Sequence, residues 1–141
     1  GGKGVRIAKA KAASDTPAKR RANHMGAVYS ADGRYLYYAR KDGGFGSRQR
    51  LPLWQIARRD LSNDVETLIT AAPGSAFRPA LSPNGELLAY VTREDQRSVV
   101  RLRDLRTGVD RPVSTLAEAD EQESRYTRDL FPNYGFGPSG R

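Results

Sequence analysis

The chain contains no cysteine and a single histidine, His24. Without cysteine it can form neither disulfides nor thiolate metal sites, and an oxidising or a reducing compartment is equally compatible with it. No apolar run approaches the roughly 18 residues of a membrane-spanning helix, so no membrane span is predicted. The first residues, GGKGVRIAK, have no initiator Met and no hydrophobic segment typical of a signal peptide, and we expect the chain to be a fragment of a longer polypeptide.

Acidic residues are fewer than basic ones: 16 Asp and Glu against 24 Lys and Arg, a net charge of +8 over 141 residues. The basic excess is strongest in residues 1–23, whereas acidic side chains gather in residues 118–129. A basic chain can neutralise nucleic-acid phosphates. Here the basic residues are scattered through strand-like segments without a reading helix or an RNA-binding signature. We therefore predict a solvated basic surface and no specific nucleic-acid partner.

One pattern occurs twice in the chain, as YSADGRYLYYARK at 29–41 and as LSPNGELLAYVTR at 81–93. Each copy has an Asp-Gly or Asn-Gly turn, a strong hairpin signal because tight turns need the positive φ that Gly, Asn and Asp tolerate. A near-continuously hydrophobic run follows each turn, at 35–39 and 87–91, as expected for a strand covered on both faces. Such a repeat is typical of supersecondary units that stack on one another.

Two further strands are predicted in each copy, at 53–61 and 67–70 in the first and at 99–105 and 112–114 in the second. The third strands alternate apolar residues with Arg, which places one face inward and the other outward. Pro112 favours an edge position for the last strand, where a missing N–H does least harm. The segment 41–52, KDGGFGSRQRLP, is predicted to be a protruding loop.

Partial copies flank the two complete ones. VRIAKAKA at 5–12 aligns with WQIARRDL at 54–61, and NYGFGPSGR at 133–141 resembles the start of the second copy. Four-stranded units of roughly 45–50 residues have the length of propeller blades. We therefore predict an all-β fold of antiparallel four-stranded blades, a partial β-propeller with two full blades plus two partial ones. The predicted division is the end of a preceding blade at 1–22, blades at 23–72 and 73–116, an inter-blade loop at 117–132, and the start of a following blade at 133–141.

The residues that catalysis needs are missing from this pattern. His24 alone cannot supply the several ligands of a catalytic metal site. A Ser-His-acid triad would also depend on His24, and no Gly-x-Ser-x-Gly elbow is present. GGFG at 43–46 precedes no helix and is predicted to be a loop rather than a phosphate cradle. Trp54 is expected in the packing between blades. We predict no catalytic, cofactor-binding or metal-binding residues in this segment.

The segments SADGRYLYYA and SPNGELLAYV resemble the repeats of TolB-like propellers, relatives of the WD-type propellers, over about residues 23–114. Four segments resemble more narrowly the N-terminal propeller of secreted or periplasmic amidohydrolases: PLWQIARRDL at 52–61, PGSAFRPALSP at 73–83, RLRDLRTG at 101–108 and DEQESRYTRDLFPNYGF at 120–136. In that family a metal-dependent hydrolase barrel follows the propeller. The resemblance therefore implies a periplasmic or secreted location and a metal such as zinc in a parent hydrolase domain, not in this segment.

Three turn residues depart from the family pattern. Ala31 replaces the usual Pro, Asn84 replaces the usual Asp, and Ser139 stands in the third turn. These changes weaken the sequence match but leave residues that the same turns accept.

Propellers bind partners at the mouth of the central channel, where inner strands and loops converge. The inner strands are predicted at 27–29 and 78–81, and Arg78 is the charged side chain placed there. The segment 117–129 is long for a connection between blades, and long connections are commonly functional. The predicted binding surface combines Arg78 with residues of this segment: Gln122, Glu123, Arg125 and Arg128. For any one of the charged residues taken alone, the alternative to a binding role is that its charge is paired locally within a solvated linker.

Three functions are compatible with these features. The leading one is a non-catalytic propeller segment that serves as scaffold or interaction module of a larger exported amidohydrolase. The alternatives are a stand-alone TolB-like module that binds envelope proteins, and the propeller of a serine peptidase. The expected partners are the rest of its own propeller, a C-terminal hydrolase domain and another protein. An isolated chain is expected to self-associate, because terminal repeats need a polar cap.

Overall fold

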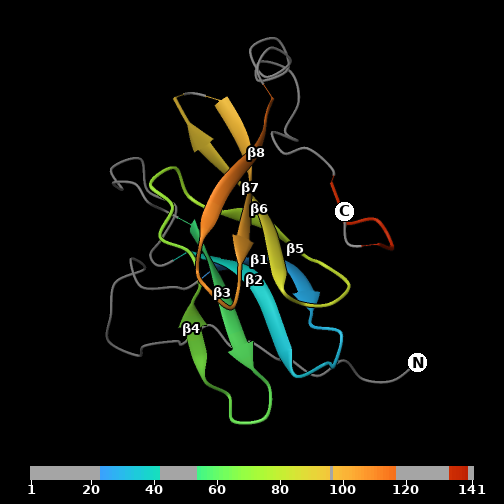
Figure 1. Ribbon diagram of the computed structural model, residues 1–141. Coiled ribbons are helices and arrows are strands. Elements are labelled where there is room, and N and C mark those ends of the chain that lie inside the picture. Colours follow the sequence, from blue (N-terminus) through green and yellow to red (C-terminus); the bar gives the residue numbers. More distant parts are fainter. Residues whose placement is uncertain (1–22, 42–53, 96, 117–133, 140–141) are drawn as a thin grey trace, which may run out of the picture.

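The computed structural model describes residues 23–41, 54–95, 97–116 and 134–139 (Figure 1). They form two four-stranded sheets. The first contains β1 (Asn23–Tyr29), β2 (Tyr35–Lys41), β3 (Trp54–Asp60) and β4 (Glu66–Leu68). The second contains β5 (Phe77–Leu81), β6 (Leu87–Glu94), β7 (Arg97–Asp104) and β8 (Asp110–Leu116). The all-β prediction is confirmed. In the described ranges no helix is long and apolar enough to cross a membrane.

Each sheet is an antiparallel meander in which every strand pairs with its neighbour along the chain. The two sheets share one register: Arg59 lies opposite Glu66 in the first, and Arg103 lies opposite Asp110 in the second. We call residues at the same register position of the two sheets equivalent. The meander of four strands is the architecture of a propeller blade. β4 is shorter than predicted and β8 longer, because Asp110 and Arg111 also pair with β7.

The two repeated turns have the same hydrogen bonds. Gly33 N donates to Ser30 O at 2.9 Å, and Gly85 N donates to Ser82 O at 2.8 Å. Both glycines have positive φ, +70° and +73°, which explains why each turn ends in Gly. In each turn the serine hydroxyl also accepts the N–H of the residue that begins the next strand. Ala31 and Asn84 therefore change the sequence of these turns without changing their geometry.

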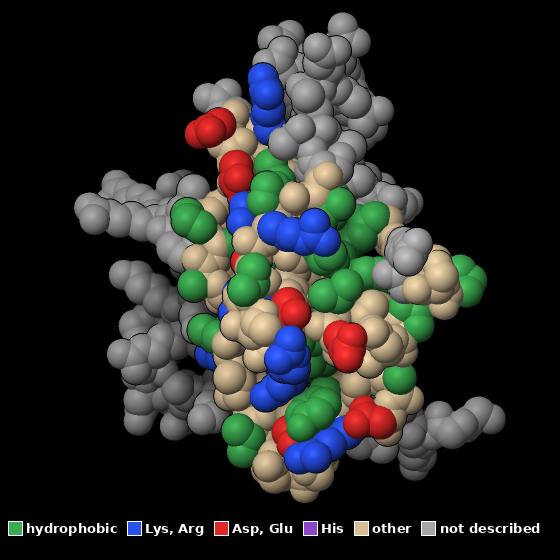
Figure 2. Space-filling model, in the orientation of Figure 1, with side chains coloured by type: hydrophobic (Ala, Val, Ile, Leu, Met, Phe, Trp, Pro, Cys, Tyr) green, Lys and Arg blue, Asp and Glu red, His purple; other side chains and the backbone are tan. Residues whose placement is uncertain are grey.

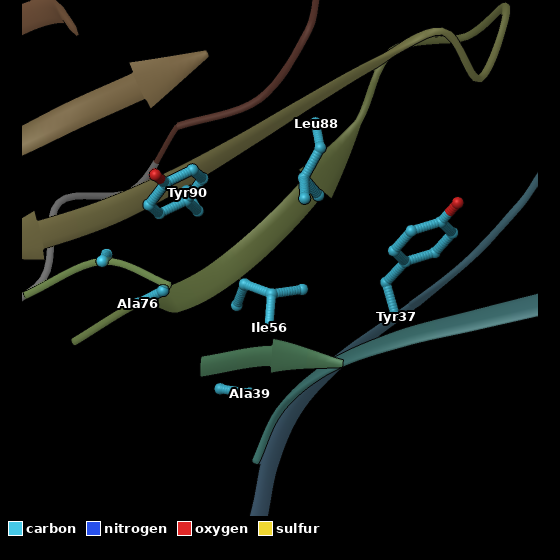
Figure 3. Packing of buried hydrophobic residues seen from close by; sticks show 7 residues of the cluster. Tyr37, Ala39, Ile56, Ala76, Leu88 and Tyr90 are labelled. Carbon is cyan, nitrogen blue, oxygen red and sulfur yellow. The ribbon is translucent and has the colours of Figure 1, made fainter. Parts of the chain in front are cut away.

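The sheets pack face to face over one apolar core. Tyr37, Ala39 and Ile56 of the first sheet meet Leu88 and Tyr90 of the second (Figure 3). All five side chains are buried, and Ile56 and Leu88 are fully buried. Burying side chains of this size contributes about 1.5–3 kcal/mol each. The stacked blades are therefore held together mainly by this core.

Trp54 lies at the edge of this core, with its ring 6.1 Å from that of Phe77. The prediction that Trp54 packs between blades agrees with this position. The two sheets approach each other most closely through β1 and β5. These edge strands therefore form the inner side of the pair of blades.

The linker between the sheets is bonded to both of them. Ala76 N donates to Trp54 O at 2.8 Å in the first sheet, and Arg93 N donates to Gly74 O at 3.3 Å in the second. A Cβ added at Gly74 would lie 1.6 Å from Arg93 O, so only glycine fits there. The close backbone approach fixes the path of the linker across β6.

The two sheets lie within the ranges predicted for full blades, 23–72 and 73–116. The segments predicted as the end of a preceding blade, 1–22, and as an inter-blade loop, 117–132, lie outside the described residues. The GGFG segment at 43–46 also lies outside them. Of the predicted following blade, residues 134–139 are described and include a turn at Pro138 and Ser139. The limits of the partial blades therefore stay predictions.

Candidate functional site at the inner strands

A β-bulge interrupts each inner strand at the same place. The register shifts between Met25 and Ala27 in β1 and between Phe77 and Ala80 in β5. The bulge contains Gly26, at φ 55°, in the first sheet and Arg78, at φ 49°, in the second. A left-handed conformation is easy for glycine and costs an ordinary residue on the order of 1–3 kcal/mol. Arg78 is therefore held in a strained backbone conformation that a glycine would adopt freely.

The backbone of Arg78 is fixed from two sides. A Cβ added at Gly26 would lie 3.9 Å from Arg78 Cα and 3.8 Å from Pro79 Cδ, so β1 packs directly against this bulge. On the other side, the Tyr134 hydroxyl donates a hydrogen bond to Arg78 O. Burial raises the pKa of Tyr134, which keeps the phenol protonated as the donor. The inner edge is thus a junction at which β1 and the Tyr134 hydroxyl both contact the bulge of β5.

Of the predicted binding surface, the structure describes Arg78, which lies half-buried in β5. Gln122, Glu123, Arg125 and Arg128 lie outside the described residues, so their proximity to Arg78 stays a prediction. The sequence analysis missed Tyr134. Its position just before the GPSG turn, in the predicted inner strand of a following blade, is the signal that points to it.

Each sheet also carries a tyrosine paired with a carboxylate. The Tyr38 hydroxyl donates to Glu66, which also binds Arg40. In the second sheet the Tyr90 hydroxyl donates to Asp110 Oδ2 at 2.6 Å. Burial, reinforced by Glu66, raises the pKa of Tyr38 to about 12. These pairs satisfy polar groups at the faces of the sheets, and their acids lie at the first residue of β4 and β8.

Side chains suited to metal or acid–base chemistry are sparse. His24 in β1 stacks edge-to-face on Tyr38, with ring centroids 5.1 Å apart. In the part of the chain that the structure describes, no group of three or more His, Cys, Asp or Glu could hold a metal ion. Over the face shown in Figure 2, acidic and basic side chains are interspersed with apolar ones. Around the inner-strand bulge, the described residues therefore offer the Arg78 side chain and backbone groups.

No protein-family model and no curated protein sequence matches the chain. Solved structures do match it. TolB from Acinetobacter baumannii superimposes with a TM-score of 0.54 and 18% identity, over 65% of this chain and 21% of that one. A protein of Agrobacterium tumefaciens described as a TolB gives 0.53 and 24%, over 72% of this chain and 36% of that one. The chain has the TolB-like β-propeller fold.

Two peptidase propellers have the same fold. Acylaminoacyl peptidase matches with a TM-score of 0.50 and 16% identity, over 68% of this chain and 14% of that one. The β-propeller domain of the trilobed protease from Pyrococcus furiosus gives 0.50 and 18%, over 71% and 29%. The TolB-like segment thus spans well under half the length of each of these proteins. The predicted TolB-like resemblance is confirmed, whereas the narrower resemblance to amidohydrolases stays a prediction.

Proposed function

We propose that this TolB-like segment is a non-catalytic scaffold or interaction module of a larger exported hydrolase. The observation that carries the proposal is Arg78, held in a left-handed conformation at the inner-strand bulge where the equivalent residue is Gly26. Strained residues of this kind persist where the surrounding structure imposes them, and they cluster at ligand-binding sites. The inner strands of a propeller lead to its central channel, where partners bind.

The proposed parent is a periplasmic or secreted metal-dependent amidohydrolase, on the strength of the sequence resemblance at 52–61, 73–83, 101–108 and 120–136. Its metal, for example zinc, would then belong to a C-terminal hydrolase domain. The proposed partners are the remaining blades, that hydrolase domain and a protein bound at the channel. A serine-peptidase parent is the second candidate, because two peptidase propellers superimpose on this chain. A stand-alone TolB-like module is the third.

The identity of the parent protein can be tested by the sequence that follows residue 141 in the complete polypeptide. Further blades and then a strand with a His-x-His motif support the amidohydrolase. A Gly-x-Ser-x-Gly elbow identifies a peptidase instead, and a stop after the last blade leaves the stand-alone module. We also expect the purified chain to hydrolyse no amide or ester, with or without added zinc. Metal-dependent turnover that survives repurification would contradict a non-catalytic role.

The role of Arg78 is tested by R78G in the complete protein, with cross-linking and mass spectrometry in the envelope fraction. Glycine adopts the observed φ of 49° without strain, so this variant removes the guanidinium and keeps the bulge. We expect unchanged folding and loss of the cross-links that the inner strands make to the partner. The same cross-links at wild-type yield would refute a recognition role for Arg78.

A further inference from the structure

A cleft of about 720 Å³ lies between the linker that joins the sheets and the outer strands of the second sheet. Linker residues 71–74 form one wall, and the other contains Tyr90, Arg101, Arg103 and Asp110. The first sheet ends in a β4 of three residues, whereas β8 of the second sheet has seven. Its volume lies within the range of ligand pockets, about 300–1,000 Å³.

Most polar groups on this wall already have partners. Asp110 accepts hydrogen bonds from the Tyr90 hydroxyl at 2.6 Å and from Arg101 Nε at 2.7 Å. Arg101 also binds Glu94, with 2.8 Å between Nη1 and Oε1. These contacts stiffen the wall and give both members of its strongest pair, Arg101 and Asp110, hydrogen-bond partners.

Arg103 is the exception. Its Nη1 atom lies 3.5 Å from Asp110 Oδ2, which is longer than the roughly 2.7–3.2 Å of a hydrogen bond. Among the described residues this is its one ion pair with a carboxylate, and its side chain is only 26% exposed. A half-buried guanidinium has five N–H donors and is stabilised best by a carboxylate bound through two of them. Arg103 therefore has donor capacity to spare at the cleft.

The equivalent arginine of the first sheet shows what fills that capacity. Arg59 Nε donates to Asp64 Oδ1 at 2.6 Å, and Arg59 Nη2 lies 2.5 Å from the same oxygen. Asp64 belongs to the β3–β4 turn, where its N–H donates to Asp60 O at 2.8 Å and its φ is 64°. An arginine at this register position thus binds a carboxylate supplied by the adjoining turn.

In the second sheet that carboxylate is missing. The β7–β8 turn repeats the same bond, from Gly108 N to Asp104 O at 2.8 Å, with a φ of 75° at Gly108. A Cβ added at Gly108 would lie 3.5 Å from Arg103 Nη2, so a side chain here would reach the guanidinium. Glycine supplies no side chain there, and the guanidinium that such a side chain would reach belongs to Arg103, which lines the cleft.

We propose that the cleft binds a carboxylate of a peptide segment, which pairs with Arg103 in the place that Asp64 occupies beside Arg59. The proposal deepens the interaction role proposed above and rests on it. A single negative charge fits better than a phosphate dianion, because Asp110 lies 3.5 Å from the same guanidinium and repels a second charge. The cleft is several times larger than one carboxylate and admits the neighbouring residues of a peptide.

The test uses fluorescence anisotropy of labelled peptides with the 141-residue chain at physiological salt, where non-specific attraction to its charge is screened. One peptide is amide-capped with a central glutamate, the second replaces this residue with glutamine, and the third carries only a free C-terminal carboxylate. We expect the glutamate peptide, the C-terminal peptide or both to bind, which identifies the source of the carboxylate. The glutamine peptide should bind at least tenfold more weakly.

Two substitutions should weaken binding at least tenfold, R103Q by removing the guanidinium and G108D by supplying an internal carboxylate. G108D should fold, because Asp64 adopts the same turn conformation. G108N fills the same space without a charge, so it should weaken binding less than G108D does. N63D makes the same charge change in the other turn, and it should bind within twofold of the wild type. Thermal melting followed by circular dichroism confirms that each variant is folded.

Equal affinity for the glutamate and glutamine peptides would overturn the proposal, as would wild-type binding by folded G108D. Inorganic phosphate would overturn the preference for a carboxylate if it displaced the glutamate peptide at the concentration at which that peptide is half-bound. These titrations do not depend on the identity of the parent protein. The sequence that follows residue 141 tests the proposed parent separately, so the two failures are distinguishable.

Discussion

Gly74 provides a sharp test of the way the two blades are joined. In G74A the added Cβ would lie 1.6 Å from Arg93 O, less than half of an ordinary van der Waals separation. The obstacle is backbone of β6, which is paired with β7 at this position, so the linker rather than β6 has to move. That movement breaks the hydrogen bond from Arg93 N to Gly74 O. It also displaces the linker from the inter-blade core, where Ala72 and Ala76 are buried.

The expected loss of stability follows from these two effects. The broken hydrogen bond costs about 1 kcal/mol. Displacing a tightly packed segment costs typically about 1–3 kcal/mol more. The free energy of unfolding of G74A should therefore fall by roughly 3 kcal/mol, a large part of the roughly 5–15 kcal/mol of a typical domain. For a chain of this length the melting temperature should fall on the order of 10 °C.

Urea denaturation and thermal melting measure this difference, with G135A as the matched control. A Cβ added at Gly135 meets no atom within 4 Å, and Gly135 is not in the positive-φ region. G135A should therefore stay within about 0.5 kcal/mol of the wild type. A G74A variant that melts within about 2 °C of the wild type would refute the close approach of the linker to β6.

Three further predictions concern titration and association. Hydrogen bonds from Arg34 and then Ser62 lower the pKa of Asp60 in the folded state. The stability that this carboxylate contributes is therefore present above the unfolded pKa near 3.8 and is lost as the pH falls below that value. The urea midpoint should fall between pH 5 and 3, and a constant midpoint would contradict this. Y38F should remove a phenol ionisation near pH 12 from the absorbance titration at 295 nm, and a step lost near pH 10 would be inconsistent with the burial of Tyr38. The isolated chain should self-associate, since apolar side chains such as Leu68 and Val113 are exposed on its outer strands; light scattering that shows a monomer at all concentrations would contradict this.

The local sequence was sufficient to predict the blades. Gly33 and Gly85 mark turns that need positive φ, and hydrophobic runs follow at 35–39 and 87–91. These signals act between residues close in the chain, so they can be read without the fold. The single histidine was equally visible in the sequence, and the prediction of a segment without catalytic residues rests on it.

The tertiary structure decided which residues meet across the blades. Nothing in the sequence around Gly74 shows that it lies against Arg93, and nothing around Tyr134 shows that its hydroxyl reaches Arg78. The difference between Asp64 and Gly108 also becomes meaningful only once both turns are superimposed on their arginines. Hydrogen bonds and close approaches of this kind depend on how two sheets stack, which local turn and strand preferences do not specify. The repeat therefore determined the blades, whereas their packing created the inner-strand junction and the cleft.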